Sequence, residues 1–204
     1  MGRLRRPKQL EFPRHAGWGG RRANAGRKPT GPTAGVAHRP RPPLASRYPV
    51  HVTVRVARGV WNLRSRRSFR VIGRAIAAGA DRLGLRVCAF SVQGNHIHFL
   101  CEATDGGALA RGMKGLNGRL AKGLNRLMGR KGRVIADRFH SRILRTPTEV
   151  KRVLAYLQGN RAHHAKAWGE SLPTSYRDPY CSASPGHGVA LPAPHTYLLR
   201  RERP

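Results

Sequence analysis

The run from Gln93 to Glu102 constrains this chain most strongly, because polar residues alternate there with bulky apolar ones. Side chains of a β-strand point alternately to its two faces, so the run predicts a strand. His96 and His98 would share one face, and the apolar residues between and after them would point into a core. Neutral imidazole is the commonest protein ligand for metals, which makes the pair a candidate metal site. The alternative interpretation is two polar side chains on a solvated face.

Further segments have the apolar patterns of strands and helices, and their order predicts the fold class. Beside the histidine strand, strands are predicted at residues 51–56, 85–92 and 138–145, and helices at residues 65–82, 106–128 and 147–167. The order β-α-β-β-α-β, followed by one more helix, is that of a ferredoxin-like arrangement. We therefore expect an α+β fold with an antiparallel sheet and an additional C-terminal helix.

Composition divides the chain into one domain and two tails. Residues 1–45 are basic, rich in Pro and Gly, and without apolar periodicity, so a disordered tail is expected there. Residues 169–204 contain many Pro and Ser residues and few periodic apolar ones, and they are also expected to be a disordered tail. The folded domain is predicted at residues 46–168.

The charge of the chain points to its partner. The 40 Lys and Arg residues outnumber the 9 Asp and Glu residues, which gives a formal net charge of +31. Such an excess destabilises a compact protein by self-repulsion unless a polyanion neutralises it, so nucleic acid is the expected partner.

Two groups of basic residues are candidate DNA contacts. The segment Gly26–Pro29 resembles the short basic hooks that enter the minor groove, through Arg27 and Lys28. The helix at residues 106–128 carries further cations largely off its apolar stripe; these candidates are Arg111, Lys114, Arg119 and Lys122.

Cysteine usage and hydropathy exclude several classes of protein. Cys88, Cys101 and Cys181 show no Cys-x-x-Cys spacing, which argues against a zinc ribbon and a disulfide framework. The chain has no long apolar run and no apolar signal core. A cytoplasmic protein without membrane contact is therefore expected.

The helix predicted at residues 147–167 supplies the second part of the candidate site. Tyr156 and Asn160 are four residues apart and share a helix face at the edge of its apolar stripe. Placed beside the histidine strand, the amide of Asn160 with His96 and His98 could hold one divalent ion that positions a phosphodiester. Tyr156 would then be the nucleophile. A tyrosine at the edge of an apolar stripe is also common as half-buried packing.

Other titratable side chains are weaker candidates. Tyr176 and Tyr180 fall in the Pro-rich segment, where a nucleophile would be poorly held. His51 and His140 begin strands and are interpreted as polar strand-edge residues. His163 is interpreted as a surface group that could contact a phosphate.

The constellation resembles the HUH single-strand nucleases, and more closely the single-tyrosine transposases of the insertion-sequence-200 type and their REP-associated relatives. The matching pieces are Gly94–His98, Asp137–His140, and Tyr156 followed by Asn160. The resemblance implies that His96, His98 and Asn160 bind Mg²⁺ or Mn²⁺. It also implies that Tyr156 attacks DNA, leaving a 5′-phosphotyrosine and a free 3′-hydroxyl. The implied partner is single-stranded DNA with hairpins, and homodimers occur in the family.

Two other functions remain open from the sequence. The chain could be a catalytically inactive or domesticated nucleic-acid-binding protein on the same scaffold, or an RNA-binding sheet that stacks bases on aromatic residues. Phe90 and Phe99 are the aromatic residues on the two predicted central strands, and Phe99 faces away from the histidines. A basic ribosome-associated protein would explain the charge but not the placement of histidine, tyrosine and asparagine.

Overall fold

The computed structural model describes residues 41–167, 169–173 and 175–202. By contacts the chain divides into Met1–Arg39 and Pro40–Pro204, and the described residues all belong to the second unit. The tail predicted at residues 1–45, with Arg27 and Lys28, therefore lies almost wholly outside the described residues.

A five-stranded antiparallel sheet forms the centre of the described unit, and its strand order is β2-β3-β4-β1-β5. Leaving out the short β2, the elements follow the predicted order β-α-β-β-α-β and then a helix. In chain order the elements are β1 (Val50–Arg55), α1 (Arg66–Gly79), β2 (Asp81–Arg82), β3 (Leu85–Val92), β4 (His96–Ala103), α2 (Gly106–Leu127), β5 (His140–Ile143), α3 (Pro147–Ala167) and α4 (Tyr197–Glu202). The expected α+β class is confirmed, β5 is shorter than expected, and β2 and α4 were not expected.

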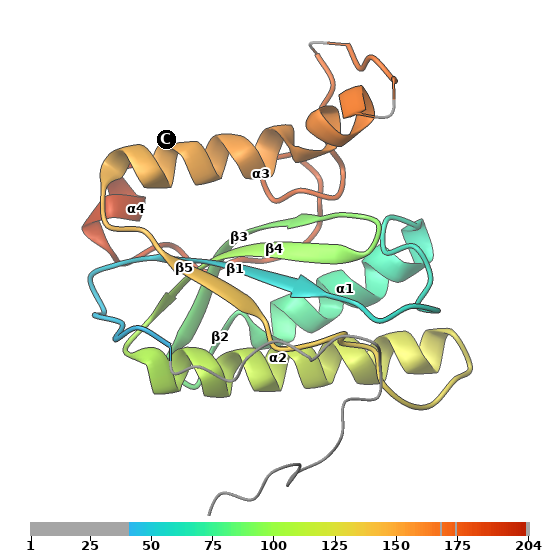
Figure 1. The fold of residues 1–204 in the computed structure, drawn as a ribbon, viewed down its shortest axis with the longest axis horizontal. Coiled ribbons are helices and arrows are strands. Elements are labelled where there is room, and N and C mark those ends of the chain that lie inside the picture. Colours follow the sequence, from blue (N-terminus) through green and yellow to red (C-terminus); the bar gives the residue numbers. More distant parts are fainter. Residues whose placement is uncertain (1–40, 168, 174, 203–204) are drawn as a thin grey trace, which may run out of the picture. The chain divides into compact units, whose positions relative to one another are not determined.

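Helices cover both faces of the sheet (Figure 1). On one face α1 and α2 pack against the alternate strand residues in the main core, which includes Val52, Phe90, Ile97 and Phe99. On the other face α3 packs in a smaller core with Leu100 and Leu157. This smaller core covers less of the sheet, so polar side chains of β1 and β4 can face α3.

The start of α3 is fixed by local hydrogen bonds around Thr146 and Glu149. Thr146 Oγ1 accepts a hydrogen bond from Glu149 N at 3.2 Å, and Glu149 Oε2 accepts one from Thr146 N at 3.2 Å. This reciprocal pair is a capping box. The Glu149 carboxylate also accepts from Arg145 N and Arg142 Nη2, and these bonds hold its pKa below its ordinary value. Glu149 thus stabilises the N-terminal end of α3.

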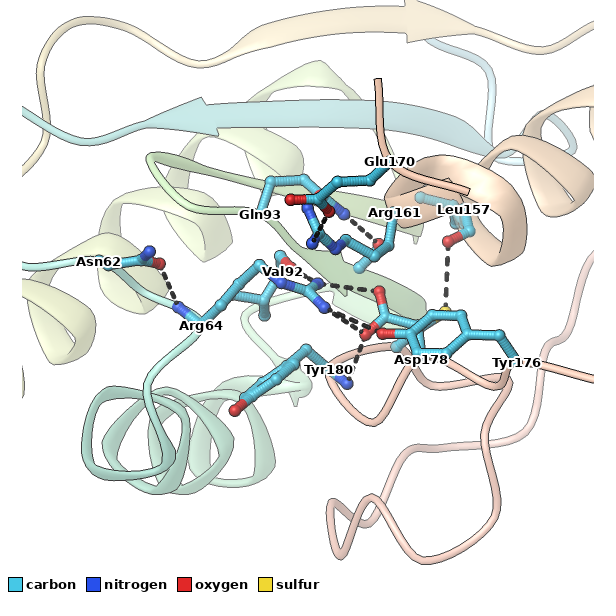
Figure 2. Close-up of polar contacts among 12 residues, drawn as sticks. Asn62, Arg64, Val92, Gln93, Leu157, Arg161, Glu170, Tyr176, Asp178 and Tyr180 are labelled. Carbon is cyan, nitrogen blue, oxygen red and sulfur yellow. Dashed lines mark hydrogen bonds and ion pairs between the residues drawn. The ribbon is translucent and has the colours of Figure 1, made fainter. Parts of the chain in front are cut away.

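The C-terminal segment is folded, which corrects the expectation of a Pro-rich tail after residue 168. Cys181 pairs with Ser91 of β3 through an isolated β-bridge, and Val92 N donates to Tyr180 O at 2.9 Å. Residues 180–182 run beside β3, and Tyr176, Asp178 and Tyr180 take part in the polar contacts drawn in Figure 2.

The end of the segment is anchored by a buried carboxylate. Glu102 accepts hydrogen bonds from His195 N and Thr196 N at 2.8–3.0 Å, and Leu199 of α4 packs with α3. Periodic apolar residues are not needed here, because single polar anchors and backbone pairing attach the segment. Hydropathy periodicity could therefore not detect it.

No helix among the described residues combines the length and the apolar character that crossing a bilayer requires.

Candidate active site

His96 and His98 lie on one face of β4, as the alternation predicted. Their ring centroids are 4.7 Å apart. Antiparallel pairing with β1 places Thr53 opposite His98 and Arg55 opposite His96. The residue between the two histidines, Ile97, is buried in the main core on the other face. The pair is therefore held on a rigid strand and not on a loop.

Helix α3 brings Tyr156 to the same face of the sheet. The Tyr156 hydroxyl lies 3.4 Å from His98 Nε2, and the two ring centroids are 5.2 Å apart. Leu157, the next residue, is buried in the smaller core and fixes the helix on the sheet. Tyr156 itself is 40% exposed. Tyr156 therefore does more than pack at the edge of the core, because its hydroxyl contacts a ring nitrogen and the residue is partly exposed to solvent.

Asn160 lies one turn after Tyr156 and is fully buried. Neither atom of its side-chain amide has a hydrogen-bond partner within the part of the chain that the structure describes. One further turn along α3, His164 lies with its ring centroid 6.0 Å from that of His96. Residues four apart share a helix face. Asn160 therefore lies on α3 between Tyr156, which contacts His98, and His164, whose ring lies near that of His96.

His51 is a site residue that the sequence reasoning missed, because it was interpreted as a polar strand-edge residue. Its Nε2 lies 3.1 Å from His98 Nδ1, and the two rings are stacked. Thr53 Oγ1 lies 3.1 Å from the same nitrogen. A partner on Nδ1 determines which tautomer a histidine adopts and how its ring is oriented. The alternation of His51, Thr53 and Arg55 was the available signal, since these residues share one strand face.

Burial and neighbouring positive charge keep the imidazoles neutral. Burial is the larger cause and lowers the pKa of His98 to about 3, with added repulsion from His96 and His51. The pKa of His51 is lowered to about 4 by burial, and then by His140 and Arg142. The pKa of His96 is lowered in the same way, by burial and by His164 and Arg55. Near neutral pH these rings therefore carry free lone pairs, the form that binds metals.

His96 and His98 fit a divalent metal ion only together with the side-chain amide of Asn160. Within the described ranges, no three His, Cys, Asp or Glu side chains form a group that could hold a metal. His96 and His98 would supply two nitrogens, and Asn160 Oδ1 is a buried oxygen that lacks a partner there. An unpaired buried carbonyl is costly, and a cation is one group that would satisfy it.

Other residues singled out in the sequence lie elsewhere. Arg111, Lys114 and Lys122 are exposed on α2, with Arg119 partly buried, on the face of the sheet opposite Tyr156 (Figure 1). The structure does not bring them to the histidines. His164, and not His163, faces His96.

Tyr176 and Tyr180 are well held, in contrast to the expectation. The guanidinium of Arg64 lies 4.6 Å from the ring centroid of Tyr180, and the Tyr176 hydroxyl lies 3.5 Å from Arg64 Nη2. Among the described residues, Tyr156 is the tyrosine whose hydroxyl lies within 3.4 Å of His98 Nε2, so Tyr156 remains the nucleophile candidate.

Comparison with solved structures shows which known fold the described domain resembles. No protein-family model matches the chain, and no curated protein matches it in sequence. Among solved structures, it is similar to a REP-associated tyrosine transposase bound to a REP hairpin. The match covers 63% of this chain and 74% of that chain at 15% sequence identity, with a TM-score of 0.51. The described domain has the fold of a tyrosine transposase.

The predicted resemblance is thus confirmed for the fold. A second similar structure is that of a candidate transposase from Deinococcus radiodurans R1, at 16% identity and a TM-score of 0.41. That match covers 53% of this chain and 86% of the other. On this transposase fold the histidine strand and the tyrosine helix pack face to face, with Tyr156 against His98.

Proposed function

We propose that this protein is a metal-dependent DNA transposase that cleaves and rejoins single-stranded or hairpin DNA through a 5′-phosphotyrosine. The observation that carries the proposal is the contact of the Tyr156 hydroxyl with His98, one helical turn from a buried Asn160 amide that has no hydrogen-bond partner among the described residues. The transposase fold and the net charge of +31 support DNA as the substrate.

The chemistry follows from the position of Tyr156. Its phenolic oxygen forms a bond to the scissile phosphorus, and the bond from phosphorus to the 3′ oxygen breaks. The phenolic proton passes to water, which reaches the partly exposed hydroxyl, and the departing 3′ oxygen takes a proton from water. In the reverse direction a 3′-hydroxyl attacks the phosphotyrosine and restores a phosphodiester. No other energy source is needed, because each step exchanges one phosphate ester for another.

The histidines and the amide define where the phosphate binds. His96, His98 and Asn160 would hold Mg²⁺ or Mn²⁺, and such an ion supplies Lewis-acid polarisation of the phosphate oxygens. His51 and Thr53 hold the Nδ1 side of His98, so its Nε2 is directed toward Tyr156. Residues of β1 thereby orient the metal ligand His98 toward Tyr156, which α3 supplies.

A non-catalytic RNA-binding sheet is disfavoured by one specific observation. Phe90 and Phe99 are completely buried in the core under α1 and α2, so neither can stack on a base. Sheets that bind RNA by stacking need aromatic rings that are exposed on a strand face.

Covalent trapping tests the proposal. The purified chain is incubated with labelled hairpin-bearing single-stranded DNA and Mn²⁺, and adducts are resolved on a denaturing gel. We expect an adduct with the wild-type chain and none with Tyr156→Phe or with a chelator. Tyr197→Phe is the matched control, because Tyr197 is 70% exposed on α4 and should leave the adduct unchanged. Tight DNA binding without an adduct under any metal would instead identify a binding protein on a transposase scaffold.

A further inference from the structure

A pocket of about 620 Å³ shares His96 with the candidate active site. Its lining also includes His164, Asn62, Gln93 and Tyr176. Its volume lies within the range of small-molecule sites, roughly 300–1,000 Å³. The pocket adjoins the Tyr156 site through His96, because the His96 ring lies 4.7 Å from that of His98 and the Tyr156 hydroxyl lies 3.4 Å from His98 Nε2.

The C-terminal segment supplies one wall and is fixed there by a buried ion pair. Arg64 donates to both carboxylate oxygens of Asp178 at 2.8 and 2.9 Å, and the two side chains are 14% and 1% exposed. Arg64 also donates to Val92 O at 2.8 Å and approaches the Tyr176 hydroxyl at 3.5 Å (Figure 2). The phenol of Tyr176 is thus held through its hydroxyl end by a rigid neighbour.

Two amide side chains in the pocket wall each use one of their two polar atoms in a hydrogen bond within the described part of the chain. Asn62 Oδ1 accepts from Arg64 N at 2.9 Å, which leaves the amide nitrogen as a donor. Gln93 Nε2 donates to Ser91 Oγ at 2.9 Å, which leaves the amide oxygen as an acceptor. One donor and one acceptor match the edge of an unpaired base, whose polar atoms are also donors and acceptors.

Charge favours a nucleotide over an uncharged ligand. Arg161 lines the pocket and is joined to Glu170 by an ion pair at 2.9 Å, so it presents a guanidinium close to the opening. Guanidinium groups bind phosphate well. Aromatic rings such as that of Tyr176 provide a stacking surface for any base.

We propose that this pocket binds one unpaired nucleotide of the DNA strand adjoining the phosphate attacked by Tyr156. Tyr176 stacks on the base, and Asn62 and Gln93 contact its edge. This inference rests on the proposed function for its substrate. It adds a specificity site that the folded C-terminal segment completes.

The test measures DNA binding without cleavage. Hairpin oligonucleotides with a fluorescent label carry a single-stranded flank, and one abasic site is moved through the flank in a set of probes. Affinity is measured by fluorescence anisotropy in the presence of a chelator. For the wild-type chain, we expect the abasic site to weaken binding about tenfold at one position, as expected for loss of one stacked base.

Variants assign that position to the pocket. Tyr176→Ala should bind the intact probe about tenfold more weakly and lose the sensitivity to the abasic site, whereas Tyr176→Phe should keep it. Asn62→Ser retains an acceptor for the turn but removes the amide nitrogen, so it should reduce discrimination among the four bases at that position. Tyr197→Ala and Asn117→Ser are the matched controls on α4 and α2, and both should behave as wild type.

The outcomes separate this inference from the proposed function. Sensitivity at no flank position, or sensitivity that persists undiminished in Tyr176→Ala, would overturn the pocket assignment. Adduct formation at Tyr156 with such flank-independent binding would leave the strand-transfer proposal intact. Flank sensitivity that depends on Tyr176, without any adduct, would support the pocket and contradict the strand-transfer proposal.

Discussion

At the scale of single residues, Asn160 is the most informative side chain. It is fully buried in α3, and both polar atoms of its amide lack a partner among the described residues. A buried polar group without a hydrogen bond costs about 1–3 kcal/mol of stability. Proteins retain such groups mainly where function requires them. Asn160 lies between Tyr156 and His164 on one helix face, and a role in the candidate site would explain why this destabilising amide is kept.

Replacing Asn160 should therefore separate stability from activity. Asn160→Leu has nearly the same shape and removes the unpaired amide, so the free energy of unfolding should rise by about 1 kcal/mol. Adduct formation with DNA and Mn²⁺ should be lost. Urea unfolding and covalent trapping measure the two effects.

Asn117→Leu is the matched control, because Asn117 Oδ1 is also buried and has no hydrogen-bond partner in the described part of the chain, but it lies on α2. It should leave adduct formation intact. Retained adduct formation in Asn160→Leu would show that the amide is not a ligand.

At the scale of elements, the segment after α3 depends on polar anchors rather than on an apolar stripe. Asp178 is almost completely buried and forms its ion pair with Arg64, which precedes α1. Removing one partner of a buried pair leaves an uncompensated charge, which costs far more than losing an exposed pair. This buried ion pair is thus one of the polar contacts that attach the C-terminal segment, beside its backbone pairing with β3 and the hydrogen bonds of Glu102.

Asp178→Ala should lower the free energy of unfolding by about 3 kcal/mol. Asp81→Ala provides the comparison, because Asp81 is 54% exposed in its ion pair with Arg86, and should cost less than about 1 kcal/mol. Chemical denaturation of both variants measures the difference. Equal effects of the two substitutions would contradict the role of Asp178 as the anchor of the segment.

At the scale of the whole molecule, the net charge of +31 sets the response to salt. Self-repulsion of the folded chain is screened as ionic strength rises. Binding to DNA responds in the opposite direction, because it is driven by the release of counterions from phosphates.

Added salt should therefore raise the melting temperature of the free protein while weakening its binding to DNA. Between roughly 50 and 200 mM salt, the affinity should fall at least about a thousandfold if six or more phosphates are contacted. Thermal melts and anisotropy titrations in the same buffers measure both trends. A melting temperature that falls with salt would show that specific ion pairs outweigh the general repulsion.

The sequence by itself determined those parts of the site that depend on local periodicity. The period of two along β4 placed His96 and His98 on one face, and the spacing of four on α3 placed Tyr156 with Asn160. A proline in the first turn, Pro147, and a glutamate near the positive end of the helix dipole, Glu149, located the start of that helix within a few residues. These features depend on neighbours within one or two turns, so the chain specifies them before any packing.

Only the tertiary structure decided which of these faces meet. The register of β1 against β4 brings His51 to His98, and the packing of α3 brings the Tyr156 hydroxyl to within 3.4 Å of the same ring. The burial of Asn160 and the Arg64–Asp178 pair likewise join residues distant in sequence. Strand register, helix placement and single polar anchors are non-local, and one-dimensional periodicity carries no information about them.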